Sequence, residues 1–203
     1  MRRLALFLVL PSMAFAAVDG AVVNRTTGKP QPGVVVTLYQ LAGAGMQPVR
    51  TVKSDAQGVF RIDHAVQGPH LVQTIYDGVV YNRMLQPGGA TSNLELEVYN
   101  SSPKPAGAQI AQHMVLLEPL GGILHVNESV IFRNEGNLTY NDPANGTLRV
   151  FLPEDVKGAP RVMITAPQGM PVERSAAATG APNVYKVDFP VKPGETRFDL
   201  TYV

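Results

Sequence analysis

The stretch Leu94-Glu95-Leu96-Glu97-Val98-Tyr99 alternates apolar and charged side chains. Successive side chains of a β-strand point to opposite faces of the sheet, so the two leucines and the valine share one face and the two glutamates share the other. This pattern predicts a strand with one buried and one solvated face. Near the end of the chain, Phe198-Asp199-Leu200-Thr201-Tyr202 follows the same pattern.

Similar short alternations recur along the chain, and no window of it shows the apolar stripe of an amphipathic helix. Turn-forming residues separate them, as in Asp55-Ala56-Gln57-Gly58, Tyr76-Asp77-Gly78 and Asn145-Gly146. The run from Gly33 to Tyr39 is apolar at nearly every position, which predicts a strand covered on both faces or lying against a neighbouring domain. We therefore expect an all-β protein made of two tandem β-sandwich domains of immunoglobulin-like or prealbumin-like type.

Residues 1–16 have the composition of a secretory signal peptide. Two arginines precede an apolar stretch from Leu4 to Leu10, and Ala14-Phe15-Ala16 provides small residues for cleavage after Ala16. We expect a bacterial protein that is exported and is periplasmic, cell-surface or secreted. No other stretch reaches the roughly 20 apolar residues that span a bilayer as a helix, so the sequence predicts no membrane span.

The mature chain divides where its composition changes. The segment 100–108 has two prolines and no apolar alternation, which is typical of a linker. We therefore predict one β-sandwich over 17–99, a linker over 100–108 and a second β-sandwich over 109–203. Because the sequence stops at Thr201-Tyr202-Val203 within an expected strand, we also expect that the natural chain continues and that the second sandwich is truncated at its C-terminal end.

Charge and composition exclude several classes of function. The 203 residues include 17 Lys and Arg against 16 Asp and Glu, for a formal net charge of +1, and Arg2-Arg3 is the longest basic run. Nucleic-acid binding requires a basic patch, so we expect no nucleic-acid partner. There is no Cys, and so no disulfide and no Cys-based metal site or thiol nucleophile.

From Val18 to Val98 the chain resembles the carboxypeptidase regulatory-like family, a prealbumin-type β-sandwich found as an accessory module in secreted bacterial proteins. Three segments carry the resemblance: Val18-Asp19-Gly20-Ala21-Val22-Val23-Asn24, Thr27-Gly28-Lys29-Pro30 with the following Gly33-Val34, and Thr51 to Ile62 with its Ser54-Asp55 and Gly58. The resemblance implies a non-catalytic domain. Independently of it, Gly28 and Gly58 suit left-handed turn positions, Asp55 can cap its turn, and Phe60 points inward.

The sequence indicates neither a metal site nor a catalytic site. The four histidines, His64, His70, His113 and His125, lack the spacing that directs two ligands at one metal. On a strand, His125 and Asn127 would share one face and Glu128 would lie on the other. The carboxylate pairs Glu95/Glu97 and Glu154/Asp155 suit a solvated surface better than glycoside hydrolysis. We expect no enzyme activity and no cofactor.

Tyrosines are the candidate binding residues, because their rings can stack on sugars or anchor a protein partner. The four candidates are Tyr76, Tyr81, Tyr99 and Tyr140; the alternative is that they pack at strand edges. There is no Trp, the residue that carbohydrate-binding surfaces favour. We expect a non-enzymatic module that binds an envelope protein or glycan. Two alternatives are an accessory N-terminal part of a larger secreted hydrolase or transporter, and a structural surface subunit.

Overall fold

The structure is a computed structural model that describes residues 17–43, 45–156 and 159–203. The predicted signal peptide, residues 1–16, lies outside the described residues. Strands and their connections make up the described chain, which contains no helix, so the expected all-β fold is confirmed. Among these residues no helix is long and apolar enough to cross a membrane.

Strands β1 to β8 form two facing four-stranded sheets. One sheet contains β1 (Ala17–Asn24), β2 (Lys29–Pro30), β5 (Val59–Asp63) and β8 (Leu94–Val98). In this sheet, β1 pairs antiparallel with β5 and parallel with β8. The other sheet has the order β4-β3-β6-β7, with β3 (Val35–Ala42), β4 (Gly45–Lys53), β6 (His70–Tyr76) and β7 (Val79–Leu85).

Side chains from both sheets meet in an N-terminal core that includes Val22, Leu38, Phe60 and Leu96. Strand β8 buries its apolar positions alternately, as predicted from the sequence. The expectation for Gly33 to Tyr39 is wrong, because β3 has only one covered face: Val36 and Leu38 are buried, but Val35 is 44% exposed. Its side chain lies on the face opposite the core, which no other sheet covers.

The remaining strands form a second pair of sheets. The larger has the order β10-β11-β18-β14-β15, with β10 (Ala108–Leu120), β11 (Ile123–Asn134), β18 (Gly194–Tyr202), β14 (Arg161–Thr165) and β15 (Val172–Ser175). The smaller has the order β13-β17-β16, with β13 (Leu148–Phe151), β17 (Val184–Val187) and β16 (Ala177–Ala178). Between them lies a C-terminal core that includes Phe132, Val150, Ile164 and Phe198.

The hairpin of β10 and β11 extends beyond this core. Strand β11 buries Val126, Glu128, Val130 and Phe132 on one face, whereas every residue of β10 after Ala108 is exposed. Among the described residues β10 pairs only with β11, so no described strand occupies its other edge. The larger sheet therefore ends in a long, uncovered edge strand.

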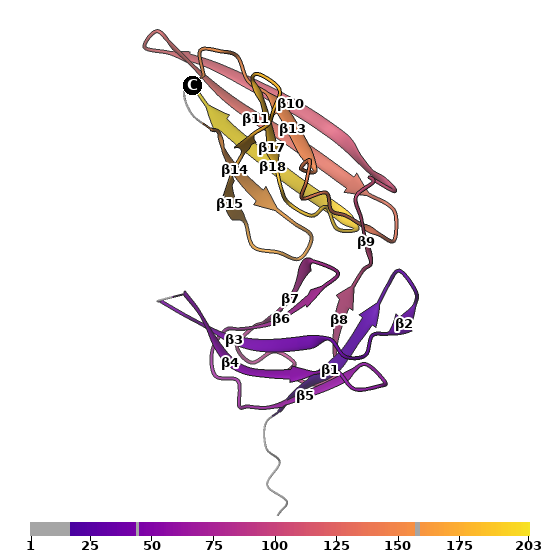
Figure 1. Cartoon of the computed structure of the whole chain (residues 1–203). Coiled ribbons are helices and arrows are strands. Elements are labelled where there is room, and N and C mark those ends of the chain that lie inside the picture. The colour runs from indigo at the N-terminus through magenta and orange to yellow at the C-terminus, as the bar shows by residue number, and fades with distance from the viewer. Residues whose placement is uncertain (1–16, 44, 157–158) are drawn as a thin grey trace, which may run out of the picture.

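The segment between the two cores is more ordered than expected of a linker. Ser101–Ser102 forms a short strand, β9, that pairs in parallel with β12 (Thr139–Tyr140). The two prolines of the predicted linker, Pro103 and Pro105, follow β9 and leave its amides free to pair. Figure 1 shows β8 leading through β9 from the lower set of strands to the upper one. The domain division at 99 and 109 stays a proposal.

Candidate functional site

A cluster of polar side chains fixes the start of the linker against the N-terminal sheets. The side-chain amide of Asn24 donates to Tyr76 Oη at 3.0 Å and to Asn100 Oδ1 at 2.8 Å, and the Tyr76 hydroxyl donates to the same Asn100 oxygen at 3.0 Å. Asn24 is 1% exposed. These contacts hold Tyr76, a predicted binding residue, in a structural role at the junction.

Tyr81, on β7, connects the two cores. Its hydroxyl donates to the backbone carbonyl of Tyr99 at 3.0 Å and lies 2.9 Å from Thr139 Oγ1, whose side chain is fully buried. Burial raises the pKa of the Tyr81 hydroxyl to about 12. Tyr81 is only 4% exposed, so its ring is packed at this junction. Its role as a binding residue stays a prediction.

Tyr99 lies beside Tyr81, with the ring centroids 6.2 Å apart, and it remains half-buried. Its hydroxyl donates to Glu97 Oε2 at 3.2 Å. Burial, and then the nearby Glu97 carboxylate, raise the pKa of Tyr99. The sequence predicted that Glu95 and Glu97 lie on a solvated strand face. In the structure both form ion pairs with Arg25, in the loop after β1.

Tyr140 lies apart from these residues, in the C-terminal sheets, where its backbone pairs with Val191. Its ring is half-buried and packs against the C-terminal core. Burial, and then the nearby Asp142 carboxylate, raise the pKa of Tyr140. The four candidate tyrosines therefore do not form one surface: Tyr81 and Tyr99 line the same cavity, whereas Tyr76 and Tyr140 do not line it.

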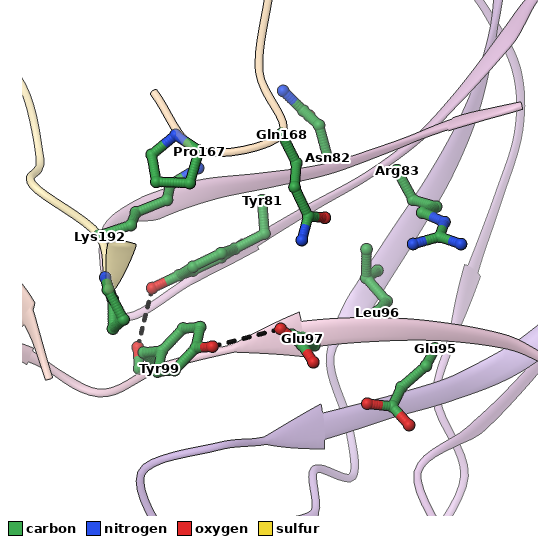
Figure 2. A pocket seen from close by; sticks show the side chains of 11 residues that line it. Tyr81, Asn82, Arg83, Glu95, Leu96, Glu97, Tyr99, Pro167, Gln168 and Lys192 are labelled. Atoms are coloured by element: carbon green, nitrogen blue, oxygen red, sulfur yellow. Dashed lines mark hydrogen bonds between the residues drawn. The ribbon is translucent and has the colours of Figure 1, made fainter. Parts of the chain in front are cut away.

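Two neighbouring cavities, and a third of about 290 Å³ lined by Asn82, Arg83, Met84 and Gln168, lie in the cleft between the N-terminal and C-terminal sheets, which we call the junction cleft. The first, of about 280 Å³, is lined by Tyr81, Asn82, Arg83, Glu95, Leu96, Glu97, Tyr99, Pro167, Gln168, Lys192 and Pro193. The second, of about 440 Å³, is more apolar and includes Met46, Leu71, Val80, Met170 and Phe189. Asn82 and Lys192 line both cavities. Figure 2 shows the first cavity, with Gln168 reaching toward it from the β14–β15 loop.

Lys192 is the functional candidate that sequence reasoning missed. It precedes β18 in Lys192-Pro193-Gly194-Glu195, which the sequence marks only as a turn. Its ammonium lies 4.8 Å from the centroid of the Tyr81 ring, within the range of a cation–π contact. Burial lowers the pKa of Lys192 to about 8. No sequence signal could have paired Lys192 with Tyr81, because the contact spans the two sets of sheets.

The backbone at Gln168 is also unusual. This residue has a φ of 56°, in the left-handed region that residues other than Gly, Asn and Asp seldom adopt. The turn is closed by the Gly169 amide, which donates to the Ala166 carbonyl at 3.0 Å. Residues in such conformations cluster at binding sites. The turn directs Gln168 toward the junction cleft.

The histidines lie apart from the junction cleft. His70 is 1% exposed beneath the N-terminal sheets, and His64 stacks near it with ring centroids 5.6 Å apart. His113 Nε2 donates to the nearly buried Glu128 Oε1 at 2.6 Å. Strand β11 turns Glu128 to the side opposite His125, as predicted from strand alternation. Across the described ranges, no group of three or more His, Asp or Glu side chains could hold a metal ion.

The turn residues singled out from the sequence lie far from the cleft, in the N-terminal sheets. Gly28 and Gly58 have φ values of 71° and 76°. Asp55 Oδ1 accepts hydrogen bonds from the backbone amides of Gln57 at 2.9 Å and Val59 at 2.8 Å. Phe60 is 2% exposed in the N-terminal core. These contacts are structural.

Comparisons with known proteins give distant structural neighbours. No protein family and no curated protein matches the chain. Among solved structures, the major pilin subunit of Bacillus cereus is 17% identical with a TM-score of 0.31, over 92% of this chain and 57% of the pilin. A putative carbohydrate binding protein from Bacteroides uniformis is 10% identical with a TM-score of 0.28, over 92% of this chain and 79% of that protein. The chain thus spans little more than half the length of the pilin.

Proposed function

We propose that this protein is a non-enzymatic binding module exported to the bacterial cell envelope, and that its ligand, a glycan or a protein, occupies the junction cleft. The observation that carries the proposal is the pair of adjoining cavities, which share Asn82 and Lys192 and receive side chains from both sets of sheets. Binding sites are typically concave, partly apolar and equipped with a few polar groups, and they occur preferentially where two structural units meet.

The positions of the carboxylates support a binding role over hydrolysis. Glu95 and Glu97, which line the first cavity, are both paired with Arg25. Hydrolysis of a glycosidic bond needs two carboxyl groups free to act on the ligand, whereas here one guanidinium engages both. The cleft is therefore better suited to hold a ligand than to cleave one.

The test uses an array of bacterial surface glycans and a variant that fills the cleft. Asn82→Trp places a large ring between the two cavities, whereas Asn82→Ala is the matched control that leaves them open. We expect wild-type protein to bind a set of glycans, Asn82→Ala to bind the same set more weakly because it loses one amide, and Asn82→Trp to lose that binding, with circular dichroism showing the same strand content in all three. Retention of the binding pattern by Asn82→Trp would place the binding surface elsewhere.

A second candidate, a structural surface subunit, is favoured by the open edge of β10. This edge strand has 13 residues; a bulge between Ile110 and Gln112 and the pair Glu118-Pro119 near its end protect its two ends, but the residues between them include no Lys, Arg or Pro. Its exposed apolar residues lie on both faces: Ile110, Met114, Val115, Leu116, Leu117 and Leu120. We propose that a second copy pairs with β10 antiparallel about Leu116, which sets Val115 of one copy opposite Leu117 of the other.

Light scattering tests this assembly. We expect a concentration-dependent dimer for the wild-type chain and a monomer for Leu116→Lys, because the two lysines would face each other across the two-fold axis and their ammonium groups would repel. Val35→Lys, at an exposed position on β3, is the control and should leave the dimer intact. A wild-type chain that stays monomeric at hundreds of micromolar would contradict self-pairing of β10.

A further inference from the structure

The cationic side chains of the junction cleft are not matched by the acidic ones. Lys192 and Arg83 both line the first cavity, and neither forms an ion pair within the described ranges. Glu95 and Glu97 line the same cavity, but both carboxylates are engaged by Arg25. The cavity therefore has two cations available to a ligand.

Lys192 is the stronger of these two cations as a ligand-binding group. Its stem lies between two cavities, and its ammonium contacts the Tyr81 ring rather than a carboxylate. A charged amine taken out of water without a counter-ion is unfavourable, which is why burial lowers the pKa of Lys192 to about 8. An anionic group bound beside the ammonium would offset that cost with a charge-assisted hydrogen bond.

Neutral amides complete the lining. Gln168 makes no side-chain hydrogen bond within the described part of the chain, and Asn82 makes one, accepting from Gln73 Nε2 at 3.0 Å. Each primary amide offers both donors and an acceptor, a combination that matches hydroxyl groups. In Figure 2 Gln168 points between Tyr81 and Arg83, so its amide can reach a ligand that also contacts Lys192.

From this arrangement we propose that the junction cleft binds an acidic saccharide, with a sugar carboxylate on Lys192 and ring hydroxyls on the amides of Asn82 and Gln168. The proposal rests on the proposed function and specifies its ligand class. A saccharide is favoured over an acidic peptide because two amides and the tyrosine rings lie beside the two cations, Lys192 and Arg83. An acidic peptide would place several carboxylates near Glu95 and Glu97.

Calorimetric titration of the whole chain tests the proposal with three probes: an oligogalacturonate, its fully methyl-esterified form, and oligoglutamate. The ester keeps the rings and hydroxyls and removes the charge. We expect the acid form to bind at least tenfold more tightly than the ester, and oligoglutamate to bind more weakly than either, because a charge-assisted hydrogen bond contributes about 1.5–3 kcal/mol.

Variants assign the effect to Lys192. We expect Lys192→Met to weaken oligogalacturonate binding at least tenfold, Lys192→Arg to retain most of it, and Lys29→Met, which removes an exposed lysine outside the cleft, to leave it unchanged. Folding of each variant is checked by its thermal unfolding midpoint.

The remaining outcomes overturn the inference in distinguishable ways. Equal binding of acid and ester would keep the cleft as a glycan site but refute the acidic ligand. Preference for oligoglutamate would replace the saccharide by a peptide. Absence of binding to all three probes, while the glycan-array signal still depends on Asn82, would refute the acidic saccharide and leave the proposed function standing.

Discussion

The hydroxyl of Tyr81 and the hydroxyl of Thr139 lie 2.9 Å apart, and this contact joins the N-terminal core to the segment that begins the C-terminal one. Tyr81 uses its hydrogen to donate to the Tyr99 carbonyl, so Thr139 is the donor to the Tyr81 oxygen. Both side chains are buried. The two sets of sheets are therefore joined by a shared polar contact as well as by the chain itself.

A double-mutant cycle measures this contact. Tyr81→Phe leaves the buried Thr139 hydroxyl without this partner, and Thr139→Val removes the donor to the Tyr81 oxygen, which keeps its bond to the Tyr99 carbonyl; the double variant removes both hydroxyl groups. We expect a coupling free energy of about 1 kcal/mol in urea unfolding. The control cycle uses the exposed hydroxyl pair of Thr37 and Thr51, which lie 3.0 Å apart, and we expect a coupling close to zero for it. Equal coupling in the two cycles would contradict a special role for burial.

Gly58→Ala and Gly28→Ala separate backbone strain from steric contact. Both glycines have left-handed φ values, so each substitution costs about 1 kcal/mol of unfolding free energy. A Cβ at Gly58 would also lie 2.8 Å from the Val22 carbonyl oxygen, whereas one at Gly28 meets nothing within 4 Å. We therefore expect Gly58→Ala to lower the urea midpoint clearly more than Gly28→Ala. Matching midpoints would show that the turn relaxes around the added methyl group.

Phe60→Ala tests the N-terminal core. The ring is 2% exposed, and removing a buried aromatic side chain leaves a cavity that costs roughly 3–5 kcal/mol. Val59→Ala, one position earlier on β5, changes a side chain that is 46% exposed, and we expect an effect within about 0.5 kcal/mol. Differential scanning calorimetry compares the two. A small loss for Phe60→Ala would mean that the N-terminal sheets do not depend on this ring.

Local patterns predicted the strands well and contacts across the chain poorly. The alternation in Leu94 to Tyr99 is a property of neighbouring residues, so its buried face could be derived from period two alone. The prediction for Gly33 to Tyr39 was wrong because the hydrophobicity of a strand does not determine whether a second layer covers it. Val35 is apolar but 44% exposed. The junction cleft depends on Lys192 meeting Tyr81, more than a hundred residues away, and no local pattern contains that contact.

Proteolysis tests how the linker is held. The Ser101 amide donates to the Asp77 carboxylate at 2.6 Å, and the Ser101 hydroxyl donates to the Asp77 carbonyl at 3.0 Å. Residues 103–107 are exposed beyond this clamp. We expect proteinase K to cut the wild-type chain slowly within 103–107, and Asp77→Gly to be cut severalfold faster, because glycine keeps the turn, with its φ of 49°, and removes the carboxylate.

Asn93→Gly is the matched control for that experiment. Asn93 also has a positive φ, 53°, but it lies before β8 and away from the linker. We expect proteinase K to cut the Asn93→Gly variant within 103–107 at the same rate as the wild-type chain. Identical rates for Asp77→Gly and wild type would show that pairing of β9 with β12 is sufficient to hold the segment.

The pH dependence of stability reports on the burial of Lys192. Its pKa is about 8 in the folded chain and 10.5 for the free side chain, so between these values the unfolded chain binds more protons. By linkage, Lys192 makes the free energy of unfolding increase as pH rises from about 8 toward 10. Below pH 8 the amine is charged in both states, and the folded chain bears the full cost of its desolvation.

Lys192→Met isolates this effect from other titrating groups. The difference in unfolding free energy between the wild-type chain and Lys192→Met should be constant below pH 7 and shift in favour of the wild type between pH 8 and 9.5. Tyr81, with its pKa raised to about 12, lowers the free energy of unfolding only near and above pH 10, where tyrosines of the unfolded chain ionise. Because both chains contain Tyr81, its contribution cancels in the difference. Lys29→Met, measured in parallel, should differ from the wild type by the same amount at every pH. If the difference in unfolding free energy between the wild-type chain and Lys192→Met does not change with pH, water reaches the Lys192 ammonium freely. Desolvation of Lys192 would then give no reason for an anionic ligand in the junction cleft.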